Sequence, residues 1–539
     1  MEEVRFDQKA KFRATIRQVT PRLVILSLLV LTALGVRLYG IGQPPMDFQG
    51  VRQYHGALLA RGLYEWLLTG HMETVPPDGF IEPPILEVLA SLSYLVLGGE
   101  HLWLSRLLSA LFWVVGGVFL YRVAIRLVSP NAAVLSVAFY LFAPTILLAS
   151  RAFMPDPMMI MLLVISIFSI VSYHEQPSTR RFVLAAVVSS LAVLVKPGIC
   201  LFQVFGVFSS LAVYRQGLRK ALFSSHLLLF TAFIVIPTGL YYFYGTFVAG
   251  FLQGQVQDKV MLKLLLRERF WQGWFHGAGN MMGYVALGGA LLGCLSARAG
   301  LPRALLIGLW GGYVLYGMVF TFHIRTHDYY QLPLIPVVAL SFGLGWDWVA
   351  GWLKRVSPGH HGRALVLTVS LLALVLGVLE HRTQILGVVQ QGRGEAFPGE
   401  YVGHTVVADY EGRAATYREI GLAVHHSSHT IFLAPDWGWP LLYHGQLDGE
   451  SGPSPGEKGT NKRGRSTPSA EARLKALRSE LSPEYFIVIK RFTNYGEEEN
   501  WESQDYKDLR RFVVKRFPVV AENDDYVVFD LRRKKDRGG

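Results

Sequence analysis

The sequence predicts a polytopic α-helical membrane protein that carries a soluble α/β domain at its C-terminal end. Two observations support this fold class. Of the 539 residues, 51% are apolar and only 17% are charged, and apolar runs of about 20 residues, enough for a helix to cross the hydrocarbon core, recur over the first part of the chain. From His381 onward the composition changes, with 23 Lys and Arg balanced by 23 Asp and Glu.

The N-terminal residues 1–22 are polar and basic and precede the first apolar run. No small-residue cleavage site follows that run, so we expect an anchoring helix and no removable signal peptide. The two cysteines, Cys200 and Cys294, both lie inside apolar runs. This placement excludes a disulfide framework and a cysteine metal site.

Eleven segments within residues 23–380 have the composition of membrane helices. They are 23–41, 103–121, 131–150, 157–173, 182–196, 199–214, 222–244, 280–297, 303–322, 331–352 and 364–380. With residues 1–22 cytoplasmic, Lys and Arg gather throughout in the loops of the cytoplasmic side, as the positive-inside rule requires. The net charge of +12 therefore sets membrane orientation, and we expect no nucleic-acid partner.

This orientation requires that residues 83–97 lie at the membrane interface and do not cross. The segment is short for a crossing and contains Glu87. The external face then carries a long first loop, residues 42–102, and the whole C-terminal part, residues 381–539. We expect a protein of the bacterial inner membrane whose C-terminal domain is external.

Ionisable groups gather on the same external face. At or inside the ends of membrane helices such groups are unfavourable unless they pair or serve a function, so they are candidates for a site. They are Asp47, Arg52, Glu82, Asp156, Lys196, Arg325 and His327. Three carboxylates with several cations suit chemistry on a lipid-borne anionic substrate.

Five stretches that contain these groups resemble the bacterial glycosyltransferase family 39 group. They are the segment from Asp47 to Gly70, Glu82-Pro-Pro, Arg151 to Asp156, Lys196-Pro, and His327-Asp-Tyr-Tyr-Gln-Leu-Pro-Leu-Ile-Pro336. The group belongs to the GT-C class, with protein O-mannosyltransferases and lipid A aminoarabinose transferases. The resemblance covers roughly residues 20–380.

The resemblance implies a GT-C-like membrane enzyme. Such an enzyme transfers a sugar, with inversion, from a polyprenyl-phosphate carrier to a hydroxyl acceptor on the external face. On this chain it makes Asp47 the general base and Asp156 the second acidic residue, with Glu82 beside the interfacial helix and Lys196 near the carrier phosphate. Many members have Asp-Glu where this chain has Asp47-Phe48. The resemblance therefore implies no role in this chain for a second acidic residue next to Asp47.

The chemistry suits these residue types. A carboxylate that takes the proton of an acceptor hydroxyl contributes about 10²–10⁴ in rate. The leaving phosphate already carries negative charge and needs cations, for which we assign Arg52, Lys196 and Arg325. His327 is assigned to donate to the phosphate or to orient a carboxylate. No spacing of His or carboxylate residues indicates a metal site. Dependence on a divalent metal is left open, because family relatives differ in it.

Structural interpretations stand beside these assignments. Glu82 and Asp156 lie beside prolines and could cap helices, and Lys196 could extend from a helix end towards water. Arg37, near the end of the first helix, is expected to be an interface anchor.

Two other functional classes are weighed against a transferase. A transporter or flippase of a lipid-linked or anionic substrate would place ionisable groups near the midplane and show broken helices in two halves. The chain has no internal repeat, and its acidic groups gather at one face. A membrane-anchored structural or binding protein would not need eleven spans.

Residues 381–539 are expected to form a small α/β domain. Strands are predicted at 429–434, 485–490 and 526–530, with helices at 414–424, 470–481 and 505–517. Residues 447–469 are rich in Gly, Ser, Pro, Lys and Glu and predict a flexible loop. The stretch Asp436–Tyr443 fits a packed aromatic turn, with contact to acceptor or sugar as the alternative.

Overall fold

The computed structural model describes residues 21–76, 79–252, 260–383, 385–386, 400–401, 404–405, 410–452, 470–494 and 497–534. Contacts divide the chain into two compact units. Unit 1 comprises Met1–Ile41, Ile81–Leu86 and Arg106–Val388, and unit 2 comprises Gly42–Phe80, Glu87–Ser105 and Val389–Gly539. Most of the predicted external loop 42–102, all but residues 81–86, is therefore grouped with the C-terminal part, whereas the sequence suggested a boundary at residue 380.

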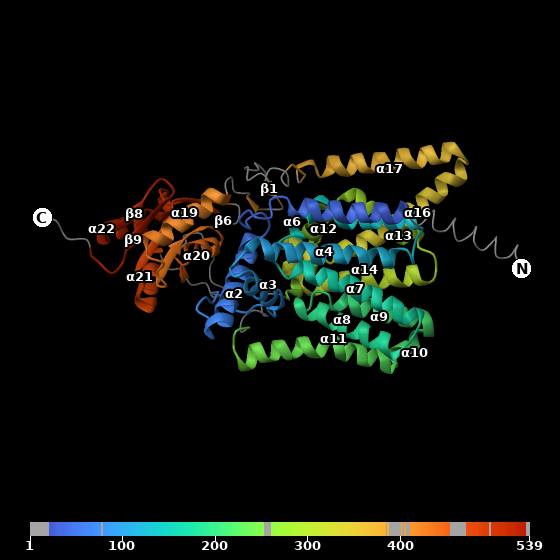
Figure 1. Ribbon diagram of the computed structural model, residues 1–539, viewed down its shortest axis with the longest axis horizontal. Helices are drawn as coiled ribbons and strands as arrows, with labels where there is room; N and C mark the ends of the chain where they lie inside the picture. Colours follow the sequence, from blue (N-terminus) through green and yellow to red (C-terminus); the bar gives the residue numbers. More distant parts are fainter. Residues whose placement is uncertain are drawn as a thin grey trace, which may run out of the picture. The chain divides into compact units, whose positions relative to one another are not determined.

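Unit 1 is a helical bundle in which α4, α7, α9 and α14 run side by side (Figure 1). Its long helices are Pro21–Leu38, α4 (Leu102–Ala124), α5 (Pro130–Phe142), α7 (Asp156–Glu175), α8 (Thr179–Val195), α9 (Leu201–Gln216), α11 (Ser225–Phe243), α12 (Glu268–Met282), α13 (Tyr284–Ser296), α14 (Leu301–Val319), α16 (Leu334–Val356) and α17 (His360–Glu380). Short elements connect them: α6 (Pro144–Ala149), α10 (Leu218–Leu222), η1 (Tyr244–Val248), η2 (Leu262–Leu266), α15 (Thr321–Thr326) and η3 (Asp328–Gln331).

All eleven predicted membrane segments are helical. The segment 131–150 is broken into α5 and α6 at Pro144, because proline cannot supply the backbone N–H that a continuous helix needs. In the described part of the chain, six helices are long and apolar enough to cross a membrane, or seven if α12 and α13 form one span bent by 100°. Crossing by the shorter segments stays a prediction.

Glycines allow the closest helix pairs of unit 1 to approach. A Cβ on Gly293 of α13 would lie 1.8 Å from the carbonyl oxygen of Ser341 of α16, and one on Gly206 of α9 would lie 2.5 Å from that of Gly308 of α14. Association within a bilayer depends on such backbone contact, because lipid tails are as apolar as the helices.

Helix α3 (Ile85–Leu97) has 13 residues and so is about 20 Å long. It is shorter than the roughly 30 Å of a hydrocarbon core. That residues 83–97 do not cross stays a prediction, because α5 and α13 are equally short. Helix α2 (Gly50–Thr69) precedes it in the first external loop.

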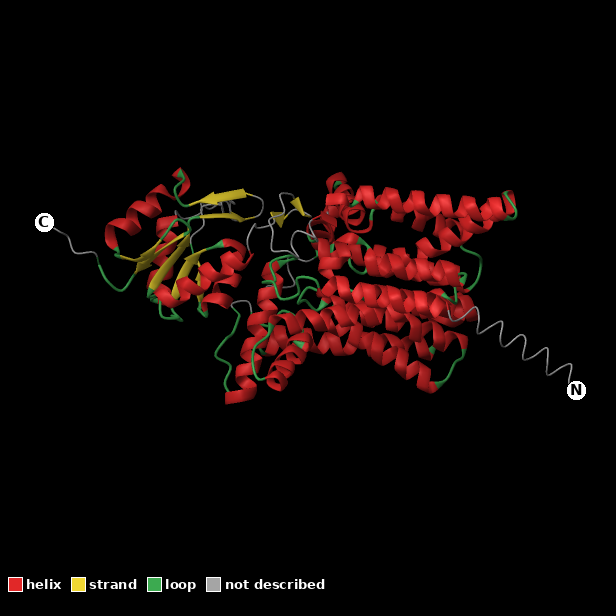
Figure 2. Ribbon diagram, turned by 45° about the horizontal axis from the view of Figure 1, so that its top comes forward, coloured by secondary structure: helices red, strands yellow, loops and turns green. Residues whose placement is uncertain are grey.

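The C-terminal part of unit 2 contains a mixed five-stranded sheet flanked by helices (Figure 2). The strand order is β4-β3-β5-β9-β8, with β3 parallel to β4 and β5, and with β9 antiparallel to β5 and β8. These strands are β3 (Thr430–Leu433), β4 (Gly449–Ser451), β5 (Tyr485–Ile489), β8 (Val519–Glu522) and β9 (Tyr526–Asp530). Two ribbons pair β1 (Glu400–Tyr401) with β2 (His404–Thr405) and β6 (Arg491–Asn494) with β7 (Glu497–Asn500). The helical elements are α19 (Tyr410–Ala423), η4 (Pro435–Gly438), α20 (Trp439–Gly445), α21 (Ala470–Leu481), η5 (Gln504–Tyr506) and α22 (Lys507–Arg516).

Both faces of this sheet are covered. Ile431, Phe486 and Phe529 pack in one cluster with Leu474 of α21 and Val513 of α22. On the opposite face, the Tyr526 hydroxyl donates to Glu419 of α19 at 2.9 Å. The predicted strands and helices form here. The predicted loop 447–469, however, begins with edge strand β4, whose backbone pairs with β3; residues 453–469 lie outside the described residues.

Helices α2 and α20 pack against each other within unit 2. The Tyr54 hydroxyl bonds His444 Nε2 at 2.7 Å, and Arg61 lies over the Tyr443 ring at 4.1 Å. Arg61 also pairs with Glu100 at 3.0 Å. Burial would lower the pKa of Arg61, but Glu100 and Tyr443 raise it overall. These contacts explain why the first external loop is grouped with the C-terminal part.

Candidate active site

A buried ion pair joins two of the predicted site residues. Lys196 Nζ lies 2.8 Å and 2.7 Å from the two carboxylate oxygens of Asp156, and the two side chains are 3% and 1% exposed. Asp156 is the first residue of α7, and Lys196 directly follows the last residue of α8. Because α7 and α8 are consecutive and pack together, the start of one meets the end of the other.

Two tyrosines of η3 cover the lysine. Its Nζ lies 4.3 Å from the ring centre of Tyr329 and 5.5 Å from that of Tyr330, distances at which a cation is attracted to the ring face. Tyr316 of α14 donates to the Tyr330 carbonyl at 3.2 Å and holds it in place. Site assignment from the sequence missed both tyrosines. Their position directly after His327-Asp328 in the quoted motif was the available signal.

The geometry defines how Asp156 acts chemically. Both of its oxygens contact Lys196, so the carboxylate is an orienting partner of the cation more than a free proton acceptor. A buried ion pair is strongly destabilised when one partner is lost. The pair therefore holds an ammonium group, with a third N–H and an aromatic wall, at one defined position.

The remaining site residues of unit 1 are more exposed. Glu82 is half-buried and lies within electrostatic range of Tyr242. His327 is half-buried, its Nδ1 bonds Thr326 Oγ1 at 2.8 Å, and its ring lies 5.9 Å from that of Tyr330. Arg325 is exposed and passes over Gly273 of α12, where a Cβ would lie 2.6 Å from Arg325 Cγ.

Asp47 and Arg52 lie in unit 2 at the start of α2. Asp47 is 7% exposed, and Gln53 Nε2 donates to its Oδ1 at 3.3 Å and to the Phe48 carbonyl at 2.6 Å. Gln49 has a φ of 50°, which turns the chain sharply before α2 begins at Gly50. The loop thus holds a buried carboxylate against the first turns of a helix. Arg52 is half-buried in the first of these turns.

A strained turn of the C-terminal domain approaches the start of α2. Asp436, Trp437 and Gly438 have successive φ values of 55°, 51° and 76°, and such a conformation is unfavourable for the first two. A Cβ on Gly50 would lie 3.9 Å from Asp436 Oδ2. Trp439 is buried against His55, but Trp437 is 45% exposed. The stretch is therefore only partly the packed aromatic turn that the sequence suggested.

The expectation that Arg37 anchors the helix at the interface is wrong. Arg37 is 0% exposed, and its guanidinium donates to Ser150 Oγ at 2.7 Å and to the carbonyls of Leu141 and Ala33 at 2.8 Å and 2.9 Å. These hydrogen bonds connect the first helix to the end of α5 and to the residue after α6. Its neighbour Arg151 donates to the Tyr39 carbonyl.

No cluster of three or more His, Cys, Asp or Glu side chains that could hold a metal ion occurs among the described residues. The site residues in unit 1 are the Lys196–Asp156 pair and the tyrosines above it, with Glu82, Arg325 and His327 more exposed. The ammonium, guanidinium and imidazole groups among them can donate hydrogen bonds to an anion.

Comparison with known proteins identifies the fold. A family model described as dolichyl-phosphate-mannose-protein mannosyltransferase matches residues 81–242. No curated protein sequence matches the chain. In structure, ArnT from Cupriavidus metallidurans, solved in the apo state and bound to undecaprenyl phosphate, is similar with a TM-score of 0.58 and 16% identity. In the apo state the match covers 95% of this chain and 98% of ArnT.

Two further glycosyltransferases are similar in structure. The oligosaccharyltransferase AglB from Archaeoglobus fulgidus, in complex with an inhibitory peptide and a dolichol-phosphate, has a TM-score of 0.57 at 12% identity over 87% of this chain and 69% of AglB. The arabinofuranosyltransferase AftD from Mycobacteria has a TM-score of 0.52 at 14% identity over 94% of this chain and 41% of AftD. The chain therefore has the GT-C fold that these glycosyltransferases share, and the resemblance seen in its sequence is confirmed for that fold and, at the level of sequence, over residues 81–242.

Proposed function

We propose that this protein transfers a sugar from a polyprenyl-phosphate carrier to a hydroxyl group at the external face of a bacterial inner membrane. Asp47 takes the proton of the acceptor hydroxyl. The acceptor oxygen then forms a bond to the anomeric carbon while the bond from that carbon to the carrier phosphate breaks, with inversion. The leaving polyprenyl phosphate retains the electron pair and needs no proton.

The observation that carries the proposal is the buried Lys196–Asp156 pair beneath Tyr329 and Tyr330. A lysine whose carboxylate partner fixes its position is suited to contact a phosphate oxygen, because two of its N–H groups are used and one can serve the ligand. The undecaprenyl phosphate in the similar ArnT and the dolichol-phosphate in the similar AglB support a lipid phosphate as the ligand. We assign Arg52, Arg325 and His327 as further ligands of the same phosphate. Glu82 is assigned as a carboxylate of the site, with Asp47 and Asp156.

We assign the acceptor side to the Asp436–Gly438 turn. The turn lies beside the first residue of α2, three residues after the proposed base, and it exposes an indole ring. A partly exposed tryptophan held by strained backbone is suited to stack on a sugar or an apolar acceptor. Trp437→Ala is then expected to raise the KM for acceptor without changing the KM for donor.

The test of the proposal is transfer by the purified full chain. Polyprenyl-phosphate sugars and candidate hydroxyl acceptors are supplied, and sugar transfer is followed by mass spectrometry. Asp47→Asn is expected to lower kcat by about 10²–10⁴. Asp508→Asn is the matched control, since its side chain is 82% exposed and it should leave kcat unchanged.

Two results would contradict the proposal. Transfer undiminished in Asp47→Asn would reject the base assignment. Absence of transfer with every donor, together with movement of labelled lipid across vesicles that contain the protein, would favour a transporter or flippase.

A further inference from the structure

A second polar pocket lies in unit 1 at the end of α7 remote from Asp156. It has a volume of about 310 Å³ and is bounded by the last turns of α7 and α9 and by the first turn of α11. His174 in this pocket is 18 residues after Asp156 on the same helix, a separation of about 27 Å. The pocket is therefore distinct from the candidate active site.

A buried histidine at this pocket has an unsatisfied atom. His174 is 9% exposed, and its Nε2 has no hydrogen-bond partner among the described residues. Its ring packs against Phe208 at 5.0 Å and Tyr173 at 5.1 Å. Native proteins rarely leave such a nitrogen without a partner, so His174 Nε2 is available to bind a ligand atom in the pocket.

The other polar side chains of the pocket are donors. Arg215 lies in the last turn of α9 and is exposed, and within the described part of the chain it forms no ion pair. Ser224 precedes α11, but its side chain does not cap the helix. Among the described residues, His226 in the first turn of α11 has ring contacts alone, with Phe182 at 5.2 Å and Tyr173 at 6.1 Å.

The electrostatics favour an anion. The positive end of the dipole of α11, a helix of 19 residues, faces this pocket together with Arg215 and His226. The described residues that line the pocket include no carboxylate. Glu175, the adjacent acid on α7, is paired with Arg126 at 3.6 Å. A phosphate group fits this combination of a guanidinium, imidazoles, a hydroxyl and a helix N-terminus.

Exposed apolar side chains lie close in sequence to the pocket residues Ser224 and His226. Phe223 is 81% exposed, and Leu228 and Leu229 of α11 are 65% and 52% exposed. A soluble phosphate would gain nothing from these side chains, whereas acyl chains would cover them. Basic pockets between membrane helices are suited to anionic lipid headgroups. We propose that this pocket binds the phosphate of an anionic membrane lipid, with Arg215, His226, Ser224 and His174 Nε2 as its ligands. The inference does not depend on the proposed transfer reaction.

The experiment measures lipid binding by native mass spectrometry of the detergent-purified full chain. Phosphatidylglycerol and phosphatidylcholine with identical acyl chains are titrated separately, and phosphatidylglycerol is expected to bind more tightly. Arg215→Gln combined with His226→Gln should weaken phosphatidylglycerol binding by about tenfold or more. Arg219→Gln, which changes a basic residue of α10 outside the pocket, should leave it within about twofold.

A second variant separates ligand binding from folding. His174→Phe keeps a ring against Phe208 and removes Nε2, so binding should weaken while the thermal unfolding midpoint does not fall. Equal loss in the Arg219→Gln and Arg215→Gln/His226→Gln variants would overturn the proposal, as would equal affinity for the two lipids. Displacement of phosphatidylglycerol by millimolar inorganic phosphate would overturn the assignment to a lipid and indicate a soluble phosphate ligand.

Discussion

Two ion pairs, one in each unit, have the same chemistry in opposite surroundings. Lys196 and Asp156 in the helical bundle are both at most 3% exposed. In the C-terminal sheet, Arg532 is 46% exposed and pairs at 3.1 Å with Asp530, which is 6% exposed and has a second cation, Arg533, at 3.7 Å. Water can replace the partner of Arg532 far more readily than that of Lys196, because the Lys196 side chain is only 3% exposed. The first pair is therefore expected to define a position in the protein, and the second to contribute little to stability.

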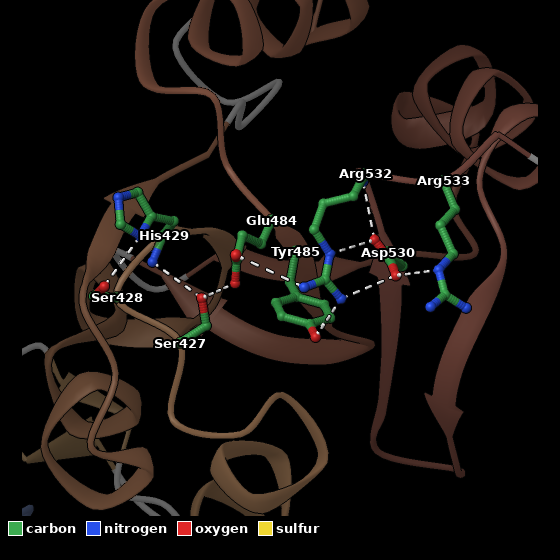
Figure 3. A network of polar contacts seen from close by, with 8 residues as sticks. All are labelled: Ser427, Ser428, His429, Glu484, Tyr485, Asp530, Arg532 and Arg533. Carbon is green, nitrogen blue, oxygen red and sulfur yellow. Dashed lines mark hydrogen bonds and ion pairs between the residues drawn. The ribbon is translucent and has the colours of Figure 1, made fainter.

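Figure 3 shows how the exposed pair is embedded in a network at one end of the sheet. Arg532 also donates to the Tyr485 hydroxyl at 2.6 Å, and Glu484 accepts from Ser427 at 2.8 Å. Tyr485 and Asp530 are directly opposite each other on β5 and β9. The network ties strand ends together, yet most of its members contact solvent, so each single contact is replaceable.

The largest effect is expected at the buried pair. Lys196→Met leaves the Asp156 carboxylate buried without its cation and should lower the free energy of unfolding by about 3–5 kcal/mol. Thermal unfolding in detergent measures this change. Lys220→Met, at an exposed site of α10, is the matched control and should have an effect near zero.

The double variant Lys196→Met/Asp156→Asn sharpens the interpretation. It removes both charges and should recover most of the lost stability. If Lys196 contacts the carrier phosphate, as proposed, sugar transfer stays low in the stable double variant. Full transfer in that variant would mean that the pair has only a structural role.

An intermediate effect is expected at His444, a half-buried residue of α20 whose ring bonds Tyr54 of α2. Burial, with Arg418 and Arg61 nearby, lowers its pKa to about 3, so the histidine is neutral in the folded protein. The unfolded chain binds a proton near pH 6.5, and stability should therefore fall as the pH drops from 6.5 towards 3, by about 1.4 kcal/mol per pH unit from this residue.

His444→Gln should remove this dependence while its amide retains a hydrogen bond with Tyr54. The measurement is the slope of the thermal midpoint against pH between 6.5 and 4.5. His429→Gln, at an exposed histidine of the same domain, should keep the wild-type slope. Identical slopes in all three proteins would show that His444 does not control the contact between α2 and α20.

The smallest effect is expected at Arg532. Its hydrogen bonds hold the pKa of Asp530 below its usual range, so their contribution is present at neutral pH and is lost as the pH falls through the lowered pKa. Arg532→Gln should reduce stability by at most about 1 kcal/mol at pH 7 and by less near pH 2. Arg511→Gln, which is 69% exposed, is the control. A loss at Arg532 as large as that at Lys196 would contradict the comparison of the two pairs.

Much of the fold followed from local pattern. The strands β3, β5 and β9 and helix α21 were predicted because apolar runs bounded by turn residues specify them over a few residues. The break at Pro144 and the 100° bend at Gly283 were not predicted, because both segments remain apolar across the change of direction. Hydropathy reports burial and carries little information on backbone continuity.

The candidate site was predicted less completely. Asp156 and Lys196 were expected at the same face of the membrane. Their ion pair and the two tyrosines that cover it were not predicted. Arg37 was assigned to the interface, whereas the structure buries it against Ser150. A charged residue at a helix end has the same local sequence whether it meets headgroups or a neighbouring helix, so only packing distinguishes the two.

The sequence alone determined that this chain forms apolar helices followed by a strand-rich domain, because length, hydropathy and alternation act over neighbouring residues. It also determined which ionisable groups lie at helix ends. The tertiary structure decided that Lys196 and Asp156 neutralise each other, that η3 places tyrosines over the lysine, and that α2 packs with α20. Those outcomes depend on distances between segments up to some 390 residues apart, such as Tyr54 and His444, which local pattern does not encode.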